Sequence, residues 1–232
     1  KKAQAFYPSI TGWGTLPWDG PQPYTLWTAG GKPVGGIMEI TDGSLPPHWF
    51  AHIATDDVDG TVARAETLGA RVIGRPTDIP TVGRFAVLRD PQGAVFAAFR
   101  PEGGADRDAA EAGVGEFSWN ELMTTDYEAA FSFYRALFGW EQVEAHDMGP
   151  MGVYFIFGQD GRQVGGMFNK PPAVEAPTAW LHYVRVENVD AAAARVTAGG
   201  GRILHGPADV PGGGRILQCT DPQGAAFALH QK

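Results

Sequence analysis

The stretch DPQGAAFALH, residues 221 to 230, decides the fold because the chain contains it twice. Residues 90 to 99 read DPQGAVFAAF, and seven of the ten positions are identical. An internal repeat indicates an architecture built from copies of one unit, so it has to be recognised before other patterns are interpreted.

The repeat extends outward from this phrase in both directions. Residues 49–72 resemble residues 180–203 at the same spacing of 131 residues. Two shorter matches keep the same order at nearly the same spacing: PVGGIM at 33–38 with QVGGMF at 163–168, and AFYPSITGW at 5–13 with SFYRALFGW at 132–140. A conserved order with small drifts in spacing is what loops of different length produce. The chain is therefore a tandem duplication.

The two copies are separated by PEGGADRDAAEAGV, residues 101–114, which is rich in Gly, Ala and acidic residues and reads as a linker. We therefore predict a first domain at 1–100 and a second at 115–232, each near the usual domain size. The second copy opens with GEFSWNELMTTD, and the first copy has no equivalent before Ala5. The first domain is expected to lack its first strand.

Within the second copy, helical and strand patterns alternate. Thr125 and Glu128 form a capping-box pattern before a helix that Gly139 would end, and Asn188 is the expected N-cap of a second helix. Each helix follows one strand pattern and precedes further ones. The predicted fold class is α+β, with two βαβββ units per copy around an open, curved, mostly antiparallel sheet.

Composition excludes several classes of function. Hydrophobic residues make up 44% and charged residues 19% of the chain, which is typical of a globular protein. The net charge of −8 and the lack of a Lys/Arg cluster argue against nucleic acid, and no apolar stretch is long enough to cross a membrane. The single cysteine, Cys219, is expected to be a buried thiol. It fits a reducing compartment, so we expect a cytoplasmic protein.

This architecture, with FYRALFGW after the first helix and DPQG before the last strand, resembles the vicinal oxygen chelate superfamily. The superfamily includes glyoxalase I, bleomycin-resistance proteins and extradiol dioxygenases. WNELMTTD, DMGPMG and GPADVPGG look most like an actinobacterial tandem-domain branch described as antigens or hydroxylases. The resemblance covers nearly the whole chain and implies a cleft in each domain.

In metal-dependent members, the resemblance implies one ligand in the first strand and one in the last strand of each βαβββ unit. The matching positions of the second copy are Trp119, a residue around Gly166, Leu181 and Ala228. Those of the first copy are Gly36, Phe50 and Ala97. None of these side chains is a metal ligand. We therefore expect no metal and no other cofactor, although a register slip of one residue would bring His182 into place of Leu181.

Strand alternation identifies the residues that share a face with these positions. They are Trp119, Glu121 and Met123 on the first strand of the second copy, Tyr183 and Arg185 on the fifth, and His230 on the last. We expect Trp119, Met123, Tyr183, Arg185 and His230 to contact a ligand. Such a lining suits a small, largely apolar molecule with a few polar anchors.

Two residues are candidates for acid–base chemistry. Glu121 would be costly to bury without a partner, so it is either a catalytic or anchoring carboxylate or a structural one satisfied by Arg185 or a backbone amide. His52 takes the place of Tyr183 in the first copy and could act as a general acid or base, or serve a structural role.

The sequence therefore predicts a protein that binds, and in one reading transforms, a small organic molecule without metal. Three alternatives stay open: a metal-dependent lyase or dioxygenase of the glyoxalase type, a sequestering module without turnover, and a scaffold whose clefts bind no ligand. Whether the protein is an enzyme and whether it forms a homodimer are also left open.

Overall fold

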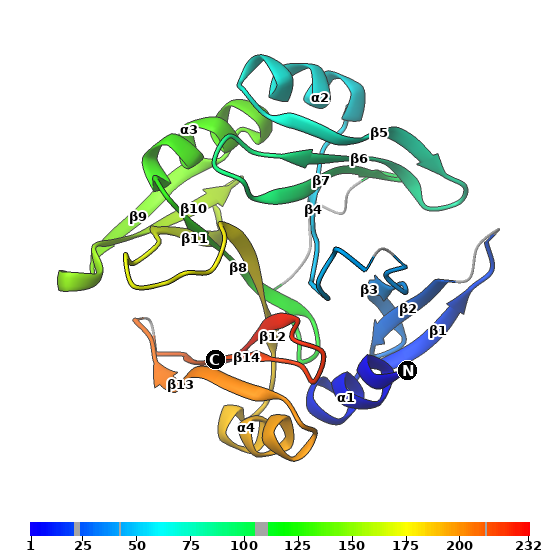
Figure 1. The fold of residues 1–232 in the computed structure, drawn as a ribbon, viewed down its shortest axis with the longest axis vertical. Coiled ribbons are helices and arrows are strands. Elements are labelled where there is room, and N and C mark those ends of the chain that lie inside the picture. The colour runs from blue at the N-terminus through cyan, green and yellow to red at the C-terminus, as the bar shows by residue number, and fades with distance from the viewer. Residues whose placement is uncertain (21–23, 42, 105–110, 212) are drawn as a thin grey trace. The chain divides into compact units, whose positions relative to one another are not determined.

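The computed structural model describes residues 1–20, 24–41, 43–104, 111–211 and 213–232 (Figure 1). Helices and strands follow one another as four modules, two from each copy of the repeat. The α+β fold class and the four-module order predicted from the sequence are confirmed. No helix of the described part of the chain is long and apolar enough to cross a membrane.

The first copy contributes two modules. The first module consists of α1 (Lys2–Thr11), β1 (Gly14–Trp18), β2 (Tyr24–Ala29) and β3 (Lys32–Ile37). The second consists of β4 (Ala51–Ala54), α2 (Val58–Thr67), β5 (Arg71–Ile79), β6 (Gly83–Arg89) and β7 (Val95–Pro101).

The second copy contributes the other two. The third module consists of β8 (Phe117–Thr124), α3 (Tyr127–Phe138), β9 (Glu141–Asp147), the short 3₁₀ helix η1 (Gly149–Met151), β10 (Val153–Gln159) and β11 (Arg162–Asn169). The fourth consists of β12 (Ala179–Arg185), α4 (Val189–Ala198), β13 (Arg202–Asp209), β14 (Arg215–Thr220) and β15 (Ala226–Gln231).

Strand pairing repeats from module to module. In the second, the strand order is β4-β7-β6-β5, with β4 parallel to β7 and the remaining pairs antiparallel. The third follows the order β8-β11-β10-β9 and the fourth β12-β15-β14-β13, again with one parallel pair each. The first module forms the three-stranded sheet β1-β2-β3 and, within the described residues, has no strand in the place of β8. This agrees with the expected loss of one strand.

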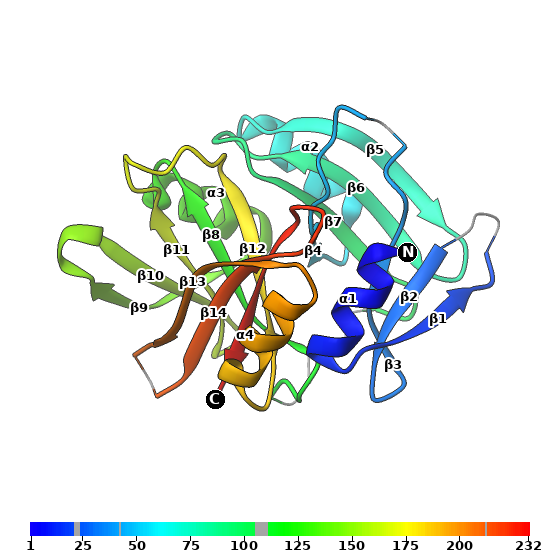
Figure 2. The same ribbon diagram turned by 60° about the horizontal axis from the view of Figure 1, so that its bottom comes forward.

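The chain divides into two compact units that cut across the two copies. Unit one comprises Lys1–Trp49, Ala109–Trp119 and Leu181–Lys232, and unit two comprises Phe50–Asp108 and Asn120–Trp180. Unit one thus combines the first and fourth modules, with α1 packed on α4, and unit two combines the second and third, with α2 packed on α3 (Figures 1 and 2). The predicted domains, 1–100 and 115–232, follow the sequence repeat. The two compact units instead each contain one module from each copy.

In unit two, the DPQG turn of the first copy holds the helix of the second copy. The Asp90 carboxylate accepts hydrogen bonds from the backbone N–H groups of Gln92 and Ala94, both at 2.9 Å, which shapes the turn. Its other oxygen accepts the hydroxyl of Tyr134 on α3 at 3.0 Å. The Trp180 indole N–H donates to that same hydroxyl at 3.2 Å. Buried polar groups require such partners, so this chain of contacts fixes α3 against the turn.

Unit one contains the same arrangement with the copies exchanged. Asp221 accepts from the backbone N–H groups of Gln223 and Ala225, and from the hydroxyl of Tyr7 on α1 at 3.2 Å. Trp49 donates its indole N–H to Tyr7 at 2.8 Å. The DPQG phrase is therefore written twice because each copy supplies the turn that holds the helix of the other copy.

Helix ends match the sequence in part. Asn188 caps α4 through the backbone N–H of Ala191, and Gly139 ends α3 in the left-handed conformation at φ 72°, both as predicted. The predicted N-cap of α3, Thr125, is wrong by one residue, because Asp126 occupies the N-cap position. The Thr125 hydroxyl instead donates to the side-chain oxygen of Gln92.

Candidate functional site

Successive side chains of β8 point alternately into the hydrophobic core and to a polar face on the other side of the sheet. Leu122 is fully buried in the core of unit two, whereas Glu121 points to the opposite face and is still only 7% exposed. Met123 and Trp119, two residues to either side of Glu121, are half-buried. Trp119 belongs to unit one and the other two to unit two.

The Glu121 carboxylate accepts a hydrogen bond from the hydroxyl of Tyr154 at 2.9 Å. Tyr154 lies on β10, and its ring covers Gly166 of β11, the register partner of Glu121. A Cβ atom on Gly166 would lie only 2.4 Å from this ring. The residue must therefore be glycine for the phenol to reach Glu121 in this way. The sequence analysis did not identify Tyr154 as the partner of Glu121.

The first copy also has a tyrosine ring packed over a strand glycine. Tyr24 of β2 covers Gly36 of β3, where a Cβ atom would lie 2.1 Å from the phenol oxygen. Burial raises the pKa of Tyr24. Gly36 and Gly166 are the positions at which the family resemblance implies metal ligands, and in this chain a tyrosine ring covers each of them.

A second polar face lies on the fourth module, on the side of the sheet opposite α4. Tyr183 of β12, Ala228 of β15 and Gln218 of β14 form one row across these strands by register. The Gln218 amide donates to the Tyr183 hydroxyl at 2.7 Å, which spans the intervening strand above the small side chain of Ala228. Ala228 is another of the four positions of the second copy at which the family resemblance implies a metal ligand. A hydrogen bond to a phenol therefore passes over it.

The next row of the same face contains Arg185 and His230, which are register partners. The Ser118 hydroxyl lies 3.1 Å from Nδ1 of His230. The pKa of His230 is lowered, first by burial and then by the charges of Arg185 and Lys232, while Glu111 acts in the opposite direction. At neutral pH this environment favours the uncharged imidazole.

Arg185 is oriented by the chain that precedes β8. Its guanidinium donates to the backbone oxygen of Ala112 at 2.6 Å and lies 3.9 Å from the Glu111 carboxylate, which also binds the Lys232 ammonium group. Its side chain is 26% exposed. A cation next to a neutral imidazole on a partly exposed face can bind an anionic or strongly polar group.

His52 lies apart from these polar groups, in the second module. Its ring is exposed and packs edge-on against Phe50 and Phe99, and its Nδ1 lies 3.2 Å from the backbone oxygen of Phe50. The register partners in its row are apolar, Ala97 and, one strand further, Val87. Among the described residues of unit two, the contacts of His52 are with Phe50 and Phe99, and its catalytic role stays a prediction.

The donor chemistry does not fit a metal centre. The implied ligand positions carry Trp119, Gly166, Leu181 and Ala228, and over the part of the chain that the structure describes no three His, Cys, Asp or Glu residues form a metal-binding group. The register of β12 pairs Tyr183 with Ala228, so the one-residue slip toward His182 is not present. His182 is buried, with its ring edge-on to Phe117.

The chain matches family models over both copies. The model described as the Glyoxalase/Bleomycin resistance protein/Dioxygenase superfamily matches residues 116–229, and a glyoxalase-like domain matches residues 1–99. Together they cover the sequence repeat almost completely.

Two sequence relatives span nearly the whole chain. The protein named "Putative glyoxylase CFP32" from Mycobacterium tuberculosis is 33% identical over 98% of this chain and 88% of its own length. The anthracycline biosynthesis protein DnrV from Streptomyces peucetius is 31% identical over 97% of this chain and 86% of its own length.

Solved structures share the fold at low identity. The 2,3-dioxygenase LapB from Pseudomonas sp. KL28 aligns with a TM-score of 0.68 at 12% identity, over 100% of this chain and 87% of that one. The Mn(II)-bound glyoxalase from Novosphingobium aromaticivorans aligns with a TM-score of 0.63 at 18% identity, over 99% and 77%. At this level the likeness concerns the fold alone.

Proposed function

Because this chain belongs to the glyoxalase, bleomycin resistance protein and dioxygenase superfamily, we propose that it binds a small organic molecule without a metal ion. Each unit supplies its own candidate contacts. In unit two these are the Glu121–Tyr154 pair as the polar anchor and Met123 as an apolar contact. In unit one they are the Tyr183–Gln218 pair as the polar anchor and Trp119 as an apolar contact. This proposal keeps the ligand class that the sequence predicts and changes the polar partners.

The observation that carries the proposal is the phenol over Gly166. A carboxylate buried to 7% exposure is costly unless it is hydrogen-bonded, and the Tyr154 hydroxyl provides such a bond at 2.9 Å. The pair offers an ionisable carboxylate and a phenol at the place where relatives with metal would hold a ligand. Such a pair suits a ligand with a carbonyl or hydroxyl group.

The names of the relatives support the ligand class. One is named as a glyoxylase and another as a protein of anthracycline biosynthesis, and both names refer to the chemistry of small organic molecules. Turnover distinguishes an enzyme from a sequestering module, since both would bind ligand saturably and only the enzyme would form product.

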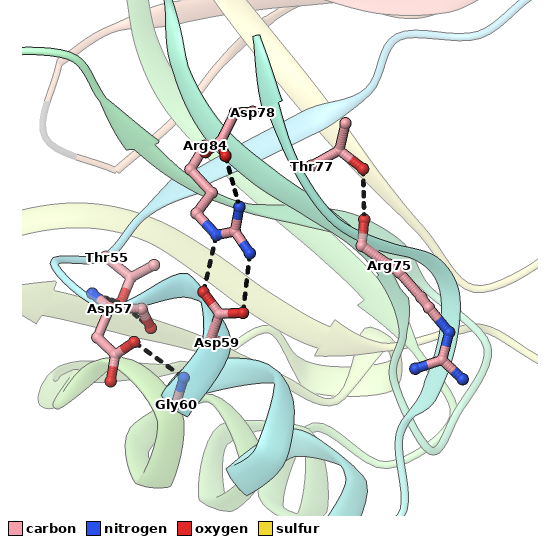
Figure 3. A network of polar contacts seen from close by, with 8 residues as sticks. All are labelled: Thr55, Asp57, Asp59, Gly60, Arg75, Thr77, Asp78 and Arg84. Carbon is pink, nitrogen blue, oxygen red and sulfur yellow. Dashed lines mark hydrogen bonds and ion pairs between the residues drawn. The ribbon is translucent and has the colours of Figure 1, made fainter.

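The test is a ligand screen by NMR with small aromatic and carbonyl compounds, run on the unaltered chain and on Glu121→Gln and Tyr154→Phe. We expect hits whose affinity falls in both variants, with the fold retained. Arg84→Met is the matched control, because Arg84 forms a surface ion pair in the same unit (Figure 3). Hits that bind both variants as tightly as the unaltered chain would remove Glu121 and Tyr154 from the site.

Location and assembly remain proposals of the same kind. We propose a cytoplasmic protein because its one cysteine, Cys219, is buried and has no second cysteine with which to form an internal disulfide. Cell fractionation tests the location, and native mass spectrometry tests whether the chain forms a homodimer.

A further inference from the structure

The polar face of the fourth module carries a charged cluster in addition to the Tyr183–Gln218 pair. We propose that the Arg185 cluster, defined as Arg185, His230 and Ser118, binds the carboxylate group of an organic ligand. This inference rests on the proposed function and names the class of ligand for this face, an organic acid.

Arg185 has the geometry for a carboxylate. A guanidinium carries five N–H donors in a planar fork. Within the described residues, Arg185 donates one of them to the backbone oxygen of Ala112 at 2.6 Å. That bond orients the group while the side chain stays 26% exposed. A positioned guanidinium of this kind forms bidentate contacts with carboxylates.

Charge on this part of the chain also favours an anion. Among the described residues, the charges that shift the pKa of His230 are those of Arg185, Lys232 and Glu111. Glu111 binds the Lys232 ammonium group directly and lies 3.9 Å from Arg185. Within this group of three the cations outnumber the carboxylate, which favours an anionic ligand beside Arg185.

His230 is placed to respond to such a ligand. It is the register partner of Arg185, and Ser118 holds its Nδ1 at 3.1 Å. Gly214 lies against its other nitrogen, since a Cβ atom there would come within 2.8 Å of Nε2. An anion bound at Arg185 would stabilise the imidazolium form, so ligand binding and protonation of His230 should strengthen each other.

The equivalent row of the first copy lacks this chemistry. Ala54 and Phe99 take the places of Arg185 and His230, in the same parallel register. The cluster is therefore not part of what the repeated fold requires. It belongs to the fourth module alone.

Benzoate and benzamide are suitable probes because they share a ring and a size but differ in charge. We expect saturable binding of benzoate, tighter than benzamide, by ligand-observed NMR titration of the full chain. Arg185→Met should weaken benzoate about tenfold or more, as the loss of a charged hydrogen bond implies, and leave benzamide unchanged. Arg185→Lys keeps the positive charge, so its affinity for benzoate should lie between those of the unaltered chain and Arg185→Met. This variant provides the test if Arg185→Met does not fold.

Arg215→Met is the matched control, since Arg215 is a nearby guanidinium already paired with Asp190 and Asp209. It should bind benzoate as the unaltered chain does. Benzoate affinity should also rise as the pH falls below about 6.5 toward the lowered pKa of His230, and His230→Gln should abolish this rise.

Equal binding of benzoate and benzamide, or equal loss in the Arg185 and Arg215 variants, would overturn the carboxylate assignment. Absence of benzoate binding up to its solubility would overturn it as well. Neither result touches the proposed function if hits in the wider screen still depend on Glu121 and Tyr154. Loss of that dependence would remove the proposed function separately.

Discussion

The second and fourth modules have the same strand order and the same turn, yet their polar faces differ. In the fourth, one row holds Tyr183 and Gln218 on either side of Ala228. In the second, the corresponding row holds His52 and Val87 on either side of Ala97. Both rows keep the central alanine, which is fully buried in each.

What the two modules share serves the fold. Asp90 and Asp221 bind a tyrosine hydroxyl in the same way. Arg84 and Arg215 each join an aspartate of the preceding helix to an aspartate near the end of the preceding strand. The difference is confined to the face opposite the helix. We infer that duplication preserved the contacts that assemble modules, while the polar groups that could bind a ligand diverged.

The largest expected effect tests the shared contacts. Asp90→Ala removes the partner of a buried tyrosine hydroxyl and of two backbone N–H groups, so we expect it to lower the free energy of unfolding by about 3 kcal/mol. Asp221→Ala should cost a similar amount. Urea unfolding followed by circular dichroism measures both. A large loss in one variant and none in the other would show that the two turns are not equivalent.

The next effect concerns the glycines beneath the phenols. Gly36→Ala and Gly166→Ala should each destabilise the chain by about 1–3 kcal/mol, because the new methyl group would collide with Tyr24 or Tyr154. Gly35→Ala is the control, since its Cβ atom would have no neighbour closer than 3.9 Å. The same unfolding assay applies. If Gly35→Ala costs as much as Gly36→Ala, strand propensity and not the phenol explains the glycine.

A smaller effect separates the two faces. Gln218→Leu removes one hydrogen bond to the buried Tyr183 hydroxyl, and we expect a loss of about 1 kcal/mol. Val87→Leu, at the matching position of the second module, removes no polar contact and should be close to neutral. If both variants lose a similar amount of unfolding free energy, altered packing and not the lost hydrogen bond explains the effect of Gln218→Leu.

The pH dependence of stability tests the environment of His230. Because its pKa is lowered in the folded chain, the unfolded chain takes up the proton first as the pH falls. The contribution is fully present above the unfolded pKa of about 6.5 and is lost as the pH falls through the lower folded value. His230→Gln should reduce the acid sensitivity of the unfolding free energy in this window by less than about 1 kcal/mol. An unchanged pH profile would contradict the assigned environment.

The smallest effect belongs to the two surface ion-pair networks. Arg84 binds Asp59 and Asp78 (Figure 3). Arg215 binds Asp190 and Asp209. Exposed ion pairs contribute little and are screened by salt. Arg84→Met and Arg215→Met should shift the melting temperature slightly and equally, and the shift should shrink at high salt. A large shift from either residue would give that network a role beyond the surface.

Much of the fold follows from the sequence because repeats and helix caps are local. The four-module order, the cap at Asn188 and the buried thiol of Cys219 were all predicted in this way. The edge strand β9 was not, since it is almost entirely exposed and shows no apolar alternation. The pairing of modules across copies also has no local signal, because it depends on contacts such as Tyr134 with Asp90.

The candidate site was predictable only in part. Alternation along single strands identified Glu121, Tyr183, Arg185 and His230 as members of polar faces. Their partners come from the strand beyond the adjacent one: Tyr154 for Glu121 and Gln218 for Tyr183. A single sequence does not reveal which side chains cross between strands. QVGGMF offered the one usable signal, since a glycine inside a strand indicates the close approach of another group.

Metal analysis tests the central claim most directly. The full chain, purified without a metal-binding tag or chelator, is dialysed against Mn²⁺, Fe²⁺ or Zn²⁺ and its metal content is measured by mass spectrometry. The account predicts no stoichiometric ion, because phenols cover Gly166 and Gly36 and a hydrogen bond crosses Ala228. One tightly held ion per chain, lost in Glu121→Gln, would contradict it and make a metal-dependent lyase or dioxygenase the better assignment.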